Sequence, residues 1–142
     1  MENLKLSEKD IYILTKYKVY KDTQSGYYRL KIGNSYQYLH RFILNAGKGT
    51  IIDHIDRDKS NNRRENLRIA TKSLNNYNRE VKSQHGRGIY FDKFGNRFRA
   101  CISYKNKTLK LGSFKTARDA KEAYNSKAVE IYGASAELHN IN

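Results

Sequence analysis

Cysteine, proline and long apolar runs are scarce or absent in this sequence. Its 142 residues include one cysteine, Cys101, which excludes a disulfide within the chain and a zinc site built from cysteines. No apolar run approaches the roughly 20 residues of a membrane-spanning helix, and the N-terminus opens on polar residues. We therefore expect no membrane association and a reducing, cytoplasmic setting. Because proline is absent, glycine and asparagine are expected to mark the turns.

Acidic residues are few compared with basic ones. Lysine and arginine number 28 against 14 aspartates and glutamates, which gives a net charge of +14. Residues 1–84 carry 17 basic and 9 acidic side chains (+8), and residues 85–142 carry 11 and 5 (+6). Such an excess in both halves indicates a polyanionic partner, with a merely solvated basic surface as the alternative. The length allows one domain or two small ones.

The N-terminal third predicts short strands. Residues 7–10 have the spacing of a capping box, whereas residues 11–14 are equally typical of a strand, so this segment stays open. Residues 27–32 and 36–39 predict two strands joined by a turn at Gly33-Asn34-Ser35. Residues 40–44 predict a short helix or strand.

His40, at the start of that last segment, has two interpretations. A single histidine between apolar neighbours is most often a structural residue. Alternatively, His40 lies beside the main site, where it either contacts the functional side chains or contacts a phosphate.

Residues 50–80 hold the densest group of chemically useful side chains. Residues 51–54 predict a strand that ends in Asp53-His54, followed by a polar loop over residues 58–65. Residues 67–70 predict the returning strand. A helix over residues 74–81, capped by Thr71 or Ser73, completes a strand, loop, strand and helix.

The side chains in this unit suit phosphodiester cleavage. Carboxylate and amide oxygens, as in Asp53 and Asn75, are hard ligands for Mg²⁺ or Mn²⁺. Asn78 shares a helical face with Asn75. A histidine with an ordinary pKa of about 6.5 can accept the proton of an attacking water, and His54 is placed for this.

This stretch resembles the HNH nuclease motif, the ββα-metal fold, in the form found in phage and intron homing endonucleases. Asp53-His54, Asn66-Leu67 and Asn75 match its pattern, over about residues 27 to 80. The resemblance implies that His54 is the general base, that Asp53 and Asn75 bind the metal, and that Asn66 holds the loop carrying His54. It also implies a bacterial host cell, if a phage encodes the chain.

Four arginines surround these residues in the sequence. We expect them to contact phosphates without reading sequence, although any single one can be a solvated charge. They are Arg57, Arg63, Arg64 and Arg68.

The C-terminal third predicts a second module. Residues 84–88 predict a linker, and three strands follow at about residues 88–91, 98–104 and 108–111. Thr116 opens a helix with a capping box, and Gly133 is expected to end it. The helix covers one face of the sheet, which leaves the other face available to enter a DNA groove.

Residues 86 to 133 resemble the Apetala-type DNA-binding domain of plant ethylene-response factors, which also occurs fused to phage HNH nucleases. Arg87-Gly88-Ile89 and Leu111-Gly112-Ser113-Phe114 are among the matching residues. Arginines of the plant proteins are replaced by Tyr90, Asp92 and Ser103, so the plant target sequence does not carry over. The alternative is a small domain that only stabilises its neighbour. The candidate DNA contacts of this module are Arg87, Tyr90, Arg97, Arg99, Ser103 and Lys110.

The sequence therefore predicts an α+β protein with an HNH (ββα-metal) domain over residues 1–83 and a three-stranded antiparallel sheet packed on one helix over residues 84–142. The expected function is a metal-dependent, site-selective endonuclease that cuts double-stranded DNA and needs no small-molecule cofactor. Nicking is the simplest outcome for a monomer, whereas cutting both strands would need a dimer or two events. A DNA-binding regulator with an inactive nuclease fold is the second hypothesis. An RNA-binding protein is the third.

Overall fold

The computed structural model describes residues 3–81, 83–136, 138, 139 and 141. The chain forms two compact units, unit 1 over Met1–Thr71 and unit 2 over Lys72–Asn142. Each unit has its own cluster of buried apolar side chains. The boundary predicted between residues 83 and 84 stays a prediction. Within the described part of the chain, no helix is long and apolar enough to cross a membrane.

Unit 1 begins with short elements. Strand β1 (Lys5–Leu6) precedes the 3₁₀ turn η1 (Glu8–Asp10) and helix α1 (Tyr12–Lys16), so the segment left open by the sequence is helical. Strands β2 (Val19–Lys21), β3 (Tyr28–Ile32) and β4 (Ser35–Tyr38) form an antiparallel sheet in that order. The predicted strand pair and its glycine turn are confirmed.

Helix α2 (Leu39–Ile43) follows β4 directly, which settles the choice between helix and strand. Its buried residues Leu39 and Ile43 pack with Ile13, Tyr28 and Leu30 in the core of unit 1. After α2, the guanidinium of Arg41 donates to the carbonyl oxygens of Ala46 and Thr50, at 3.3 and 2.6 Å. Arg41 thereby closes the loop that leads into the next strand.

Strands β5 (Ile51–His54) and β7 (Leu67–Ala70) form an antiparallel pair with the predicted bounds. The segment between them is more ordered than the predicted loop. It contains strand β6 (Asn61–Asn62), which pairs in parallel with β1, and the 3₁₀ turn η2 (Arg64–Asn66). The segment is therefore fixed at its two ends by the β5–β7 pair and in its middle by the pairing of β6 with β1.

Unit 2 starts with helix α3 (Lys72–Tyr77), which begins two residues earlier and ends four residues sooner than predicted. Strands β8 (Ile89–Asp92), β9 (Arg97–Tyr104) and β10 (Lys107–Phe114) form an antiparallel sheet with β9 in the middle. Strand β10 runs past Gly112, because a bulge between Lys110 and Gly112 lets the pairing resume.

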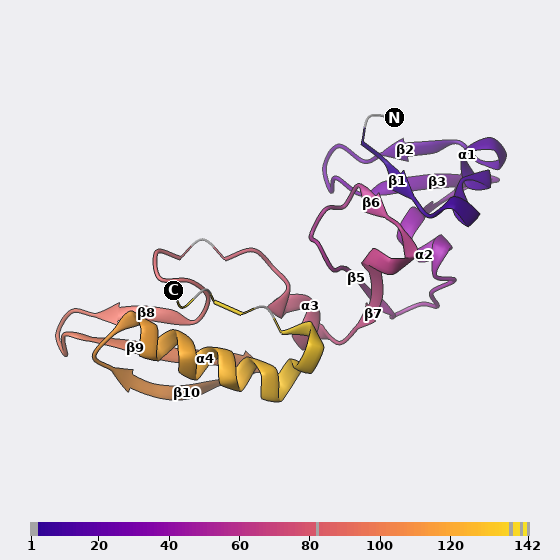
Figure 1. Cartoon of the computed structure of the whole chain (residues 1–142). Coiled ribbons are helices and arrows are strands. Elements are labelled where there is room, and N and C mark those ends of the chain that lie inside the picture. Colours follow the sequence, from indigo (N-terminus) through magenta and orange to yellow (C-terminus); the bar gives the residue numbers. More distant parts are fainter. Residues whose placement is uncertain (1–2, 82, 137, 140, 142) are drawn as a thin grey trace. The chain divides into compact units, whose positions relative to one another are not determined.

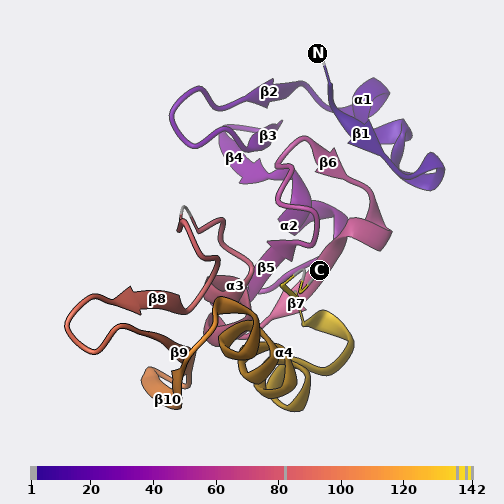
Figure 2. The ribbon, with the colours of Figure 1, turned by 60° about the vertical axis from the view of Figure 1, so that its left-hand side comes forward.

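Helix α4 (Ala117–Tyr132) lies along one side of the three-stranded sheet in both ribbon views (Figures 1 and 2). The Thr116 hydroxyl accepts a hydrogen bond from the Asp119 N–H at 3.1 Å, as the capping box predicted. The predicted apolar stripe is buried at Ala120, Tyr124 and Ala128. After α4, the chain forms the 3₁₀ turn η3 (Gly133–Ser135).

The core of unit 2 includes Ile89, Ala100 and Ile102 from the sheet, the buried stripe of α4 and Tyr77 from α3. The mixed α/β architecture and the sheet packed on one C-terminal helix confirm the predicted fold class.

Candidate active site

Asp53 and His54 end strand β5 and are both buried, with 6% and 5% of their surface exposed. Asp53 lies opposite Arg68 across the pair of strands, and the Arg68 guanidinium donates to Asp53 Oδ2 at 2.7 and 2.8 Å. Side chains alternate along a strand, so His54 lies among a different set of neighbours. The acid and the imidazole therefore lie side by side in the chain but have different partners.

His54 is held by Asn62, which is almost fully buried. The Asn62 amide nitrogen donates to the Lys59 carbonyl oxygen at 3.0 Å, so its oxygen Oδ1 is turned to His54 Nε2, 3.4 Å away. The neutral tautomer that satisfies this contact carries its proton on Nε2. Nδ1 is then the nitrogen that can accept a proton.

Burial lowers the pKa of His54 below its ordinary value of 6.5, although the hydrogen bond with Asn62 and the carboxylates of Asp56, Asp53 and Asp58 oppose this. The net direction favours the uncharged imidazole at neutral pH. An uncharged imidazole is the form that can act as a general base.

Asn66 ties together the loop that follows His54. Its side-chain oxygen accepts the Asp56 N–H at 3.0 Å, and its side-chain nitrogen donates to Asp56 Oδ1 and to the Asn61 carbonyl oxygen, both at 2.8 Å. The Asn66 carbonyl oxygen accepts the Ile55 N–H at 2.9 Å. These bonds fix the loop at the residue after His54, which is the loop-holding geometry expected of Asn66.

His40 lies beside His54, with ring centroids 5.3 Å apart and the rings nearly perpendicular. Tyr38 stacks on His40 at 5.5 Å, and the Tyr27 ring lies 5.1 Å from His40 and 5.8 Å from His54. His40 Nδ1 is buried without a hydrogen-bond partner among the described residues. Burial, together with the charges of His54 and Arg41, lowers the pKa of His40 to about 4, so this imidazole is also neutral.

A cleft of about 700 Å³ opens beside these rings. Its walls include Tyr27, Tyr38 and His40, and Arg41 and Lys48 supply positive charge. The cleft places aromatic rings and cations next to the buried His54. Stacking on bases and pairing with phosphates are the contacts that such walls offer.

The four arginines predicted to contact phosphates differ in their surroundings. Arg57 and Arg63 are exposed. Arg64 donates two hydrogen bonds of 2.8 Å to the carboxylate of Asp10, which is 1% exposed. Arg68 pairs with Asp53. Phosphate contact by each of the four stays a prediction.

Asn75, the second predicted metal ligand, is half-buried on α3 in unit 2, and Asn78 follows the end of that helix. The joint binding of one ion by Asp53 and Asn75 stays a prediction, because the two residues belong to different units. Among the described residues, no three histidine, cysteine, aspartate or glutamate side chains gather as metal ligands. The predicted pair supplies a carboxylate and an amide oxygen, a donor set that suits Mg²⁺ or Mn²⁺.

In unit 2, five of the six predicted DNA contacts have exposed side chains along the strands, namely Tyr90, Arg97, Arg99, Ser103 and Lys110. Tyr90, Arg99 and Ser113 are register partners across the sheet. Arg99 pairs with Asp92. Arg87 differs, since its guanidinium lies over the Tyr77 ring and lines a pocket described below.

Sequence reasoning gave no role to three residues of unit 1 that the structure brings to the site. Tyr27 was predicted only as the start of a strand, and Asn62 and Lys59 only as parts of a polar loop. The Lys59 ammonium lies 4.5 Å from the centre of the Tyr27 ring. No local pattern marks these residues, because Lys59 lies against a ring of the earlier β2–β4 region and Asn62 belongs to a strand that pairs with β1.

Comparison with known proteins agrees with this geometry. The family model for the HNH endonuclease domain matches residues 37–77, which include His40, Asp53, His54, Asn66 and Asn75. The chain is 32% identical over 137 residues to an uncharacterized HNH endonuclease of Acanthamoeba polyphaga mimivirus, covering 92% of this chain and 71% of that protein. No solved structure gives a significant match. On these grounds, this chain belongs to the HNH endonuclease family.

Proposed function

We propose that this protein is a metal-dependent endonuclease that hydrolyses phosphodiester bonds in double-stranded DNA. The observation that carries the proposal is His54, a buried imidazole held by Asn62 beside the buried carboxylate of Asp53. A neutral imidazole of fixed orientation is the group that general-base activation of a water at a phosphate needs.

His54 Nδ1 accepts the proton of the attacking water as its oxygen bonds to phosphorus and the bond to the 3′ oxygen breaks. Asn66 keeps the loop after His54 in place and so preserves the direction of this nitrogen. Asp53 and Asn75 would hold a divalent ion, Mg²⁺ or Mn²⁺. Such an ion stabilises charge on the scissile phosphate and the leaving oxygen.

The exposed side of the sheet in unit 2 supports a role in target selection. Arg97, Arg99 and Lys110 give this side positive charge, and its neighbour Ser103 is also exposed. Phe94 lies at the tip of the β8–β9 hairpin and is fully exposed. We infer that this module binds DNA in the manner of the Apetala-type domains it resembles, which makes cleavage site-selective.

A single site of this kind acts on one strand at a time, so the proposed product of a monomer is a nick. The homing-type activity and the phage or intron origin expected from the motif belong to the same proposal. The relative named above is from a giant virus.

Incubation of supercoiled plasmid with the protein and Mg²⁺ or Mn²⁺ tests this function. The proposal predicts open-circular product with either ion, none with a chelator, and none from His54→Ala. Linear product at the earliest times would contradict nicking. Intact plasmid with every ion and target tried would contradict nuclease activity itself.

A non-catalytic DNA-binding regulator is the second candidate. The observation in its favour is the ion pair between Asp53 and Arg68, which already engages the carboxylate proposed to bind the metal. That candidate predicts equal DNA binding with and without divalent ions, and no cleavage.

A further inference from the structure

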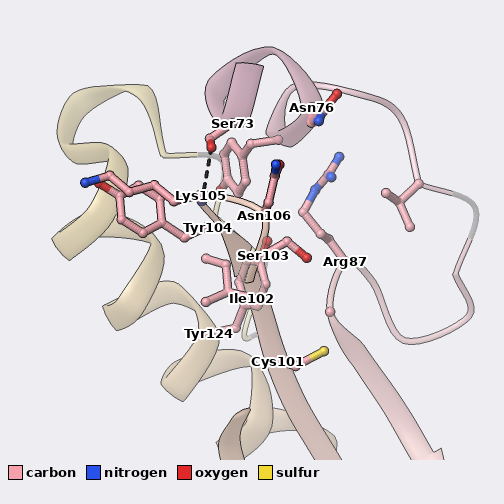
Figure 3. A pocket seen from close by; sticks show the side chains of 13 residues that line it. Ser73, Asn76, Arg87, Cys101, Ile102, Ser103, Tyr104, Lys105, Asn106 and Tyr124 are labelled. Carbon is pink, nitrogen blue, oxygen red and sulfur yellow. Dashed lines mark hydrogen bonds between the residues drawn. The ribbon is translucent and has the colours of Figure 1, made fainter. Parts of the chain in front are cut away.

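Unit 2 contains a half-enclosed pocket of about 360 Å³ whose role none of the motifs explains. It lies between α3, the loop before β8, and the end of β9 that extends beyond its pairing with β8 (Figure 3). Ile102, Tyr77 and Tyr124 form its buried wall. Its polar side chains include those of Asn76, Arg87, Ser103 and Asn106.

Arg87 is held in place at this pocket. Its guanidinium lies 5.2 Å from the centre of the Tyr77 ring and donates a hydrogen bond to the Arg79 carbonyl oxygen. Tyr77 is itself fixed, because it is 5% exposed and stacks on Tyr132 with ring centroids 4.1 Å apart. Such a support reduces the conformational entropy that the arginine would lose on binding a ligand.

Side-chain amides lie at the same end of the pocket as this guanidinium. Figure 3 shows the amides of Asn76 and Asn106 near the end of Arg87, whereas Lys105 extends toward Tyr104. The amides of Asn76 and Asn106 have no hydrogen-bond partner in the described part of the chain. Among the residues that the structure describes, no aspartate or glutamate lines the pocket. One arginine and two amides, with no carboxylate among the described lining residues, favour an anionic ligand.

Asn106 is brought there by a tight turn. Lys105 and Asn106 both have positive φ, at +48° and +61°, which is the two-residue hairpin turn of type I′ between β9 and β10. The Lys105 N–H donates to the Ser73 hydroxyl at 3.1 Å and so ties this turn to α3. The amides of Asn76 and Asn106 therefore come from helix α3 and from a turn that is hydrogen-bonded to that helix.

We propose that this pocket binds a phosphate group of a nucleotide, with Arg87, Asn76 and Asn106 as its ligands. The planar fork of arginine suits phosphate oxygens, and a volume of about 360 Å³ admits the sugar or base attached to it. This inference rests on the proposed action on nucleic acid. If the pocket binds a phosphate, that phosphate contacts α3. The same helix carries the predicted metal ligand Asn75 of the proposed nuclease site.

Cys101 provides the measurement. It is the only cysteine of the chain and lines the pocket, and burial raises the pKa of its thiol. Alkylation of the full-length protein by iodoacetamide is followed at mildly alkaline pH, without divalent ions. The probes are inorganic phosphate, deoxyadenosine 5′-monophosphate and a DNA duplex. The proposal predicts that the nucleotide or the duplex slows alkylation.

Two variants identify the ligands. Arg87→Gln removes the cation, and Asn106→Gly removes one amide in a turn where positive φ favours glycine, so the fold is kept. In each variant, the probe concentration that halves the alkylation rate rises roughly tenfold or more, as the loss of a hydrogen bond to a charged group predicts. Arg118→Gln is the control, because it removes one arginine from the exposed surface of α4.

Equal protection in Arg87→Gln, Asn106→Gly and wild type would overturn the proposal, and so would the absence of protection by any probe. Protection by the mononucleotide shows that a free nucleotide binds, whereas protection by the duplex alone assigns the phosphate to the DNA backbone. Both results support the site. Failure of the nuclease proposal is a separate outcome. It would appear as intact plasmid and would not change the protection of Cys101 from alkylation.

Discussion

Arg63 and Arg64 are neighbours with the same side chain and different surroundings. Arg63 is exposed, whereas Arg64 donates two hydrogen bonds to the buried carboxylate of Asp10, 54 residues earlier in the chain. Burial of a carboxylate is costly unless it is paired, so Arg64 has a structural role whether or not it also contacts DNA.

Replacement of each arginine by alanine separates these roles. Arg64→Ala is expected to lower the free energy of unfolding by about 1–3 kcal/mol, because it leaves the Asp10 carboxylate buried without its partner. Arg63→Ala is expected to change it by no more than about 0.5 kcal/mol. Urea unfolding of the two variants measures both values. Equal stability of the two would mean that the Asp10 pair contributes nothing.

His40 predicts a dependence of stability on pH. Its pKa is about 4 in the folded protein and 6.5 in an unfolded chain. The unfolded state therefore binds more protons between these values, and stability falls as pH decreases from about 6.5 to 4. The full effect is on the order of 3 kcal/mol, and the lowered pKa of His54 acts in the same direction.

The change His40→Gln tests this, because glutamine does not titrate. The loss of unfolding free energy between pH 7 and pH 4.5 should be smaller in this variant than in the wild type. The lowered pKa values of Asp56 and Asp58 affect stability mainly below about pH 5, and both proteins carry these two carboxylates, so the difference between wild type and variant reports His40. An unchanged pH profile in His40→Gln would contradict the assignment of a buried neutral imidazole.

The helices and strands that could be predicted from the sequence are those whose pattern is local. The β5–β7 pair, the two adjoining strands of unit 1, and the sheet and helix of unit 2 follow from periodicity, turn residues and caps. The parallel pairing of β1 with β6 did not, because each has two residues and their partners are more than 50 positions apart. The Asn62 contact with His54 depends on that same pairing, since Asn62 belongs to β6.

Helix α3 shows a second limit. Residues 74–81 suited a helix, but the structure begins it at Lys72 and ends it at Tyr77. Tyr77 is buried in the core of unit 2, whose other members come from residues 89 to 128. The position of α3 thus depends on packing of Tyr77 against residues later in the chain. The residue pattern around α3 alone does not reveal such packing.

Gly88 connects the loop after α3 to the sheet and predicts a sharp loss of stability on substitution. It has φ +69°, and an added Cβ would lie 2.1 Å from the Cys101 carbonyl oxygen and 2.6 Å from the Tyr124 ring. Gly88→Ala is expected to destabilise the protein by roughly 3–5 kcal/mol.

Gly133→Ala is the matched control for this prediction. Gly133 also has positive φ, at +53°, but no heavy atom lies within 4 Å of its added Cβ, so the expected loss is about 1–2 kcal/mol. Thermal unfolding of the two variants compares them. Equal losses would show that the close approach of β8 and β9 at Gly88 is not as described.

The net charge of +14 is shared by the two halves of the chain, and both can contribute to DNA binding. If the exposed side of the sheet contacts phosphates, removal of one contact should reduce the dependence of DNA affinity on salt by about one counterion. Arg97→Gln is expected to show this reduction, and Arg118→Gln on α4 is the control. An equal salt dependence in both variants would contradict the use of the sheet.

DNA binding is proposed to involve the basic surfaces of both halves, whereas bond cleavage is proposed to depend on Asp53 and His54. Neither residue is placed among the proposed phosphate contacts of the sheet or of the pocket in unit 2. Loss of the imidazole alone should therefore remove chemistry without removing affinity.

The most direct test is single-turnover cleavage of a labelled DNA duplex with excess protein and Mg²⁺, for wild type and His54→Ala, with binding of the same duplex measured in Ca²⁺. Cleavage by His54→Ala is expected to fall by a factor of about 100 or more, as it does on loss of a general base, while affinity stays within a few-fold. Cleavage at the wild-type rate would contradict the role of His54. A collapse of binding to the same extent as cleavage would show that His54 maintains the fold and does not carry out the reaction.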